Sequence, residues 1–199
     1  MEIAELVKTQ RAYFRTGVTR SAQFREYALR KLQAGLRDYA DRIAEATARD
    51  LGKDPLETYM CETGILLDEI TYAIKNLRKW MKEKRVASPL AQFPSRSFIS
   101  PEPYGVALIL SPWNYPIQLS LAPLIGAIAA GNCAVIKPSA YAPASSRVIA
   151  ELIGEIYPPE YCAVVEGGRE ENSTLLEQKF DYIFFTGSVA VGRVAMQIG

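Results

Sequence analysis

The sequence predicts an α/β protein in which a helical N-terminal arm precedes a doubly wound, mostly parallel sheet. From residue 104 onward, short apolar runs alternate with helical stretches, and the runs read YGVALIL, NCAVIKP, YCAVVEG and FDYIFFTG. Continuous apolar strands between helices are typical of a parallel sheet that is covered on both faces. Residues 2 to about 85 instead repeat apolar residues at three- and four-residue spacing, as amphipathic helices do. We therefore expect a helical region over 1–85 and a nucleotide-binding α/β domain over 104–199.

The helical region contains one clearly marked helix start, at Asp54-Pro55-Leu56-Glu57. This stretch offers an N-cap, a proline at the first helical position and a glutamate at the capping-box position. Apolar or small residues then recur every seven positions, at Leu56, Thr63, Ile70 and Leu77, with Tyr59, Leu66, Ala73 and Trp80 between them. The spacing predicts one long helix, whose stripe either packs on its own domain or forms the seam of a dimer.

Residues 86–103 break the helical pattern with four prolines and several serines. Proline cannot continue a helix, and clusters of this composition are typical of loops. The pattern alternates only around Phe98 and Ile99. We expect a connector with a short extended segment.

The charge balance and the cysteine pattern exclude several classes of function. There are 23 Lys and Arg against 22 Asp and Glu, so no overall field attracts nucleic acid or an anionic membrane. The N-terminus lacks the apolar core of a signal peptide and no apolar stretch could span a bilayer, so we expect a cytoplasmic protein without a membrane span. The three cysteines lie far apart and histidine is absent, which argues against a disulfide framework, a metal site and His-based catalysis.

Candidate site residues follow the predicted strands, because ligands of such sheets collect at the carboxyl ends of the strands. Those ends read SPWN, KPS, EGG and TGS, and the usual G-x-G-x-x-G fingerprint of Rossmann domains is missing. The nearest stretch is 187–192, GSVAVG, directly after the fourth strand. Its glycine and the free N–H groups of the next helix favour an anion such as a pyrophosphate, although such a turn, taken alone, is usually a simple turn with an N-cap.

Several of these motifs, taken together, resemble the aldehyde dehydrogenase superfamily. They are W-N-Y-P after one strand, A-I-A-A-G-N before the next, K-P-S after it, and F-T-G-S-x-x-V-G after the fourth strand. Their order and spacing are most similar to the class 3 members, over roughly residues 50–199. The resemblance implies a Rossmann-like cofactor domain, here an incomplete aldehyde dehydrogenase fold. It also implies oxidation of a small-molecule aldehyde to an acid, through a cysteine thiohemiacetal and with NAD or NADP as hydride acceptor.

The resemblance assigns roles to individual residues. Asn114 is the candidate catalytic residue, an uncharged amide that donates to the oxyanion; the alternative is that it only satisfies backbone groups in its proline-bounded turn. The residues implied in cofactor binding are Trp113 in the channel, Lys137 and Ser139 at the ribose, Gly187 and Ser188 at the pyrophosphate, and Val191 near the adenine. Trp113 could also be an ordinary core residue.

Two departures from the family pattern affect the expected function. Ala140 stands where the family usually has a glutamate after K-P-S, so the preference between NAD and NADP is open. The family's catalytic cysteine and general-base glutamate lie in later G-Q-x-C and E-L-G-G motifs, which this sequence does not contain. The cysteines that are present, Cys61, Cys133 and Cys162, lie outside that context and are expected to be structural thiols.

We therefore expect the 199-residue chain alone to be inactive, as the N-terminal part of an enzyme that forms a homo-oligomer such as a dimer. Two alternatives stay open. The chain could be a non-catalytic nucleotide-binding or dimerising module. It could also be part of an acyl-phosphate or acyl-CoA reductase, which shares the fold and runs the chemistry in reverse.

Overall fold

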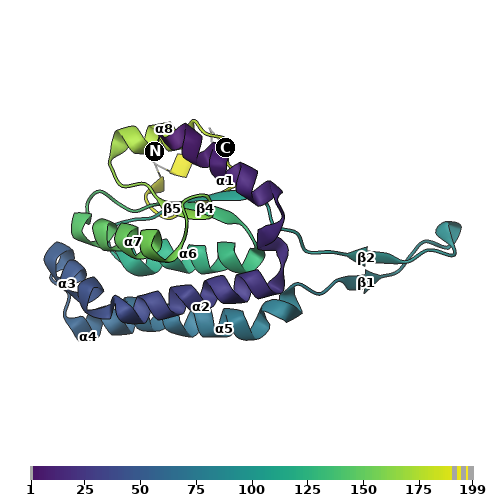
Figure 1. Cartoon of the computed structure of the whole chain (residues 1–199), viewed down its shortest axis with the longest axis horizontal. Coiled ribbons are helices and arrows are strands. Elements are labelled where there is room, and N and C mark those ends of the chain that lie inside the picture. The colour runs from purple at the N-terminus through teal and green to yellow at the C-terminus, as the bar shows by residue number, and fades with distance from the viewer. Residues whose placement is uncertain (1, 190–191, 194–195, 197–199) are drawn as a thin grey trace.

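The computed structural model describes residues 2–189, 192, 193 and 196, and shows a layered α/β arrangement (Figure 1). The N-terminal helices are α1 (Ile3–Arg15), α2 (Ala22–Asp38), α3 (Ala40–Leu51), α4 (Pro55–Thr58) and α5 (Gly64–Trp80). A two-stranded sheet of β1 (Lys84–Val86) and β2 (Ser97–Ile99) follows. The remaining elements are β3 (Val106–Leu110), α6 (Pro116–Ala130), β4 (Cys133–Lys137), α7 (Pro143–Ile156), β5 (Cys162–Val164), α8 (Arg169–Leu176) and β6 (Tyr182–Phe185).

The second sheet is four-stranded and wholly parallel, in the order β5-β4-β3-β6. Its two central strands, β3 and β4, are buried at every residue, which explains why their sequences are apolar up to Lys137, the last residue of β4. This arrangement confirms the predicted fold class, a helical N-terminal region followed by a doubly wound parallel sheet.

Two apolar clusters cover the two faces of this sheet. Alternate residues of a strand point to opposite faces, and on β4 Ala134 and Ile136 join the cluster of α6 and α7 while Val135 joins the cluster of α1 and α8. Leu6 of α1 is 6% exposed in that second cluster. Figure 1 shows α1 and α8 above the strands and α6 and α7 below them, with α2 and α5 forming a further layer beneath α6.

The predicted long helix is present over residues 55–80, but it contains a π-helical turn, and the stripe predicted along it was wrong at its N-terminal end. A π-helical turn, Tyr59–Thr63, separates α4 from α5, and the Gly64 N–H donates to the Tyr59 carbonyl five residues earlier. Such a turn adds one residue and rotates the preceding face by about 100°. Leu56 is therefore 64% exposed, whereas the stripe residues Thr63, Leu66, Ile70, Ala73 and Leu77 are buried. The buried stripe packs on α2 and α6 of the same chain, as in the first of the two alternatives.

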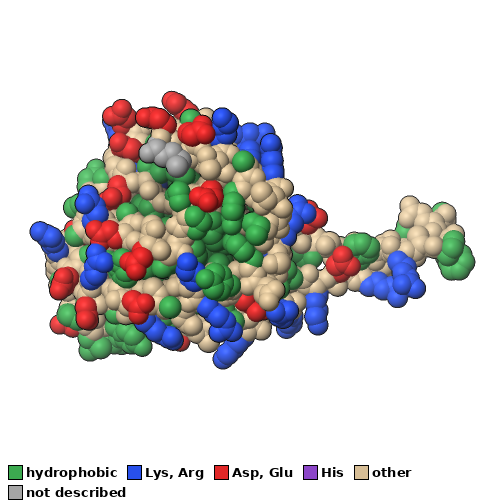
Figure 2. Space-filling model, viewed as in Figure 1, with side chains coloured by type: hydrophobic (Ala, Val, Ile, Leu, Met, Phe, Trp, Pro, Cys, Tyr) green, Lys and Arg blue, Asp and Glu red, His purple; other side chains and the backbone are tan. Residues whose placement is uncertain are grey.

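The predicted connector contains an antiparallel hairpin that projects from the body of the molecule (Figures 1 and 2). Apolar side chains at its tip face solvent: Leu90 is 94% exposed and Phe93 is 83% exposed. The three-part division of the chain at residues 85/86 and 103/104 stays a prediction. None of the described helices is long and apolar enough to cross a membrane.

Candidate functional site

The predicted site residues gather at the carboxyl edge of the parallel sheet. All four strands run the same way, so the loops that follow them meet at one edge. In chain order the strands are arranged 3-2-1-4, which places the topological switch point between β3 and β6. The residues brought to this edge are Trp113, Asn114, Lys137, Ser139, Gly187 and Ser188. The remaining predicted residue, Val191, lies outside the described residues.

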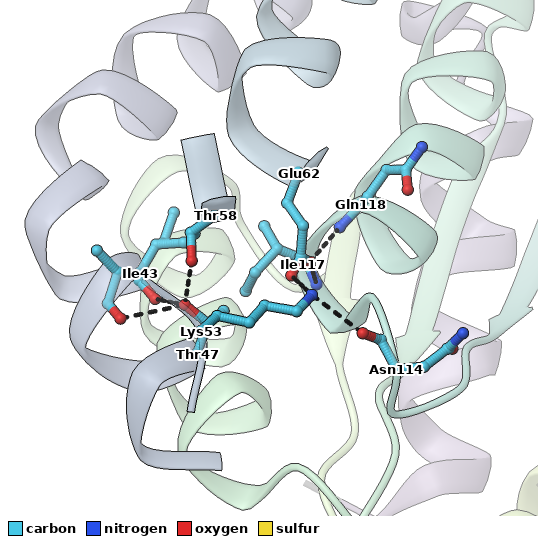
Figure 3. A network of polar contacts seen from close by, with 9 residues as sticks. Ile43, Thr47, Lys53, Thr58, Glu62, Asn114, Ile117 and Gln118 are labelled. Carbon is cyan, nitrogen blue, oxygen red and sulfur yellow. Dashed lines mark hydrogen bonds and ion pairs between the residues drawn. The ribbon is translucent and has the colours of Figure 1, made fainter. Parts of the chain in front are cut away.

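The loop after β3 presents two exposed side chains at the switch point. Trp113 is 52% exposed, so it is not a core residue. Asn114 is also exposed, and its side chain points away from Lys53 (Figure 3). Within the described part of the chain we find no hydrogen bond of this amide, so the structure gives no support to the alternative that it caps backbone groups. Its two N–H donors face outward at the place where ligands of such sheets bind.

A buried ion pair that the sequence did not reveal holds this loop (Figure 3). The Lys53 ammonium donates to Glu62 Oε1 at 2.6 Å and to the Asn114 carbonyl at 3.0 Å, and lies 4.1 Å from the centre of the Tyr115 ring. The other oxygen, Glu62 Oε2, accepts from the backbone N–H of Ile117 at 2.8 Å. The two charged side chains are only 8% and 0% exposed. An ordinary α-helix was expected over the segment that carries Glu62. The only sequence feature that could have indicated the π-helical turn there is the glycine at position 64, inside a helical pattern.

Strand β4 ends in a buried lysine. Lys137 is 3% exposed and its ammonium donates to the carbonyls of Pro138 at 2.8 Å and Gly167 at 2.6 Å. Burial lowers the pKa of Lys137, and the nearby Glu171 carboxylate partly offsets this. An ammonium has three N–H donors, and bonds within the described residues occupy two of them, which leaves one for a hydroxyl or an anion.

The neighbouring glycine-rich loop is shaped around Glu171. Hydrogen bonds from its own backbone N–H and from that of Gly168 lower the pKa of the Glu171 carboxyl. Gly167 has φ 135°, and a side chain at this position would overlap the Glu171 carboxylate. The backbone of the loop can therefore come close to Lys137, which is what the bond to the Gly167 carbonyl requires.

The turn between Lys137 and α7 is fixed from the helical region. Asp50 accepts from the backbone N–H groups of Ala144 at 3.1 Å and Ser145 at 2.7 Å, so it caps a helix whose own N-cap residue makes no side-chain bond. Ser139 is half-buried and its hydroxyl accepts from the Tyr141 N–H at 3.2 Å. Ala140, which lies between Ser139 and Tyr141 in the sequence, is exposed. A longer side chain at 140 would meet solvent and not the core.

The loop after β6 places Gly187 and Ser188 beside the same edge. A Cβ at Gly187 would lie 2.7 Å from the Phe185 ring, so the glycine permits a tight turn. The Ser188 carbonyl accepts from the Gly192 N–H at 3.0 Å, as at the start of a helix. An open hollow of about 820 Å³ includes both residues of the turn but extends along β6, away from Asn114 and Lys137.

Two of the three cysteines are buried at the starts of their strands, at the opposite end from this edge. Cys133 is completely buried on β4, and burial raises the pKa of its thiol to about 12. Cys162 is 1% exposed, and burial raises its pKa well above the usual value. These two are structural thiols as predicted; Cys61, on the π-helical turn, is half-buried. Over the described ranges, no cluster of three acidic or cysteine side chains could hold a metal ion.

Comparison with known proteins agrees with this arrangement. The chain is 49% identical over 187 residues to 4,4'-diaponeurosporen-aldehyde dehydrogenase of Staphylococcus aureus, covering 94% of this chain and 41% of that protein. It is 47% identical to aldehyde dehydrogenase family 3 member B1 of Mus musculus, over 94% of this chain and 40% of the relative. A solved structure described as the substrate-bound state of Staphylococcus aureus AldH superposes with a TM-score of 0.97 at 46% identity, over 100% of this chain and 43% of that one.

The chain therefore spans about two fifths of the length of the curated relatives that it matches. The model of the aldehyde dehydrogenase family matches residues 1–199, and class 3 relatives cover nearly the same span. Together with the fold and the strand order, these matches show that the chain belongs to the aldehyde dehydrogenase family.

Proposed function

We propose that the full-length protein is a cytoplasmic, NAD(P)-dependent aldehyde dehydrogenase that acts as a homo-oligomer such as a dimer. It oxidises a small-molecule aldehyde to a carboxylic acid through a thiohemiacetal on a cysteine outside these 199 residues. The observation that carries the proposal is the position of Asn114, whose exposed amide stands at the switch point of the sheet beside the loops of Lys137 and Ser188.

In this proposal Asn114 stabilises the negative charge that develops on the aldehyde oxygen. A neutral amide suits this role because it donates hydrogen bonds at every pH and does not titrate. The ion pair of Lys53 and Glu62 fixes the backbone from which the amide projects, so the donor is in place before the charge forms. Preorganised donors of this kind are worth roughly 3–4 kcal/mol of activation free energy.

The chain's own residues fit a dinucleotide at the same edge. When bound, the nicotinamide supplies the hydride acceptor. The spare N–H of Lys137 and the Ser139 hydroxyl suit the ribose hydroxyls, and the helix start after Gly187 and Ser188 suits the pyrophosphate. Trp113 lines the channel, and Val191 is proposed near the adenine.

The proposed oligomer is supported by the apolar surface that the chain exposes. More than half of each of five apolar side chains is exposed: Leu90 and Phe93 at the hairpin tip, Leu56 in α4, and Tyr59 and Met60 in the π-helical turn. Clustered apolar side chains of this kind mark association surfaces. Light scattering of the full-length protein should therefore show a dimer or a larger species.

The function is tested with the full-length protein, NAD⁺ or NADP⁺, and a panel of aliphatic and aromatic aldehydes. We expect NAD(P)H formation at 340 nm, a fall of about 10²–10³ in kcat for Asn114→Ala, and no turnover by the isolated 199-residue chain. Absence of aldehyde-dependent NAD(P)H formation would show the proposal to be wrong. Full activity of Asn114→Ala would refute the role of the amide. Activity only with an acyl phosphate or acyl-CoA and NAD(P)H would favour a reductase.

A further inference from the structure

We propose that Lys53 and Glu62 are positioning residues for catalysis: they hold the Asn114 backbone so that its amide is aimed at the reacting oxygen. The inference rests on the proposed function of Asn114. It assigns a role in the reaction to the segment between α3 and α5, which is about 50–60 residues before the active-site loop in sequence.

The pair bonds both the C-terminal part of the loop and the first turn of α6 that follows it. Lys53 holds the carbonyl of Asn114, and Glu62 accepts from the N–H groups of Ile117 at 2.8 Å and Gln118 at 3.2 Å. One ion pair thus bonds the residue that bears the amide and the first turn of α6 just after it. The Tyr115 ring between these points lies against the same ammonium.

No other side chain caps the start of α6 in the described residues. Its N-cap residue, Tyr115, makes no side-chain hydrogen bond, and Pro116 at the first position has no N–H. The carboxylate of Glu62 therefore satisfies N–H groups that would otherwise be left without a partner. A carboxylate at a helix N-terminus also interacts favourably with the helix dipole.

Burial makes this attachment rigid. With side chains 8% and 0% exposed, water cannot replace either partner without entering the core. A buried ion pair is a weak source of net stability compared with an apolar pair of the same volume, but it fixes geometry through several directional bonds. The free energy lost in desolvating the two charges is better explained by a need to position the Asn114 amide than by a contribution to folding stability.

The chemistry requires such placement. A donor stabilises an oxyanion only within about 2.7–3.1 Å of the position that the charged oxygen will occupy. A displacement of about 1 Å can cost about 10²-fold in rate. Losing the bond to the Asn114 carbonyl should therefore lower kcat while leaving the affinity for the cofactor unchanged.

A double-mutant cycle in the full-length enzyme tests this inference. We expect Lys53→Met to lower kcat at least tenfold when residue 114 is asparagine, and less than threefold in the Asn114→Ala background, because the amide through which it acts is then absent. The KM for the cofactor should stay within about twofold. An equal loss of kcat in both backgrounds would overturn the proposal, since Lys53 would then act independently of the amide.

Arg25→Met is the matched control. Arg25 is also a buried cation, 6% exposed, and donates to the carbonyls of Thr19 at 3.0 Å and Ala129 at 3.1 Å, the latter at the opposite end of α6. Its loss should destabilise the protein and change kcat by the same factor in both backgrounds. Coupling to Asn114 as strong as that of Lys53 would overturn the proposal, because it would show a general effect of damage to α6.

Glu62→Gln keeps an oxygen for the N–H groups of α6 and removes the anion that holds Lys53. If Lys53→Met does not fold, Glu62→Gln replaces it in the double-mutant cycle with Asn114→Ala. Hydrogen–deuterium exchange gives a readout independent of activity: residues 112–118 should exchange at least fivefold faster in either variant. If the wild type oxidises no aldehyde, the proposed function is wrong. If exchange at 112–118 is unchanged in the variants, this inference is wrong, whatever the activity of the wild type. If neither variant folds, the pair serves the fold and the inference is wrong.

Discussion

Replacing Gly64 by alanine tests whether the π-helical turn is needed to place Glu62. Gly64 has ordinary helical backbone angles, so alanine is not excluded by conformation. Alanine is disfavoured by a steric clash: its Cβ would lie 2.7 Å from the backbone carbonyl oxygen of Tyr59. The same oxygen accepts the Gly64 N–H, so the clash acts directly on the bond that defines the turn.

The size of the effect follows from this contact. Ordinary contact of a Cβ begins at about 3.4 Å, so Tyr59 and residue 64 must separate by about 0.7 Å. Overpacking of this kind costs about 1–3 kcal/mol. Alanine at position 64 also gains about 1 kcal/mol of helix propensity over glycine. Gly126→Ala in α6 is the control, because a Cβ there meets nothing within 4 Å. It gains the same propensity without a clash. The two variants should therefore differ by about 1–3 kcal/mol.

Urea-induced unfolding of the full-length variants, followed by circular dichroism, measures this difference. We expect Gly126→Ala to unfold at a higher urea concentration than the wild type, and Gly64→Ala to unfold at a lower concentration than Gly126→Ala. Gly64→Ala should also lower kcat, because the shifted turn moves Glu62. Equal midpoints for the two alanine variants would refute the reasoning, since the π-helical turn would then tolerate a side chain at its end.

Three further predictions concern the cofactor loop and a buried thiol. Ala140→Glu should shift relative affinity towards NAD by about tenfold to a hundredfold, measured by titrating both cofactors, because a carboxylate bonds ribose hydroxyls and repels a 2′-phosphate; an unchanged ratio would exclude residue 140 as the selector. Burial lowers the pKa of Lys137, so cofactor affinity should fall as the pH rises through that lowered pKa, and Lys137→Met should bind weakly at every pH. Burial raises the pKa of Cys133 to about 12, so only the unfolded chain loses this proton above the ordinary pKa of about 8.5. Stability should then decline there by up to about 1.4 kcal/mol per pH unit, and Cys133→Val should remove that part of the slope.

The sequence predicted well the features that depend on neighbours along the chain. Asp54 is the N-cap of α4 as expected, and accepts from the Leu56 N–H at 2.8 Å. The runs that became β3 and β4 were identifiable because both faces of these strands are buried, which favours apolar residues at every position before Lys137, the last residue of β4. The meeting of the Asn114 and Ser188 loops was predictable too, since the ends of parallel strands converge whatever the side chains are.

Only the tertiary structure decided how the N-terminal helical region holds the loop of Asn114 at the carboxyl edge of the sheet. Periodicity does not reveal a one-residue π insertion, so the phase that turns Leu56 outward and Glu62 inward could not be read from the sequence. Glu62 and Lys53 look like ordinary surface charges until α6 supplies the N–H groups that Glu62 binds and the loop before α6 supplies the carbonyl that Lys53 binds. Local patterns determine which residues form strands, caps and turns. Which charges become buried partners depends on contacts between segments that are distant in the chain, because desolvation and hydrogen bonding are set by the neighbours in space.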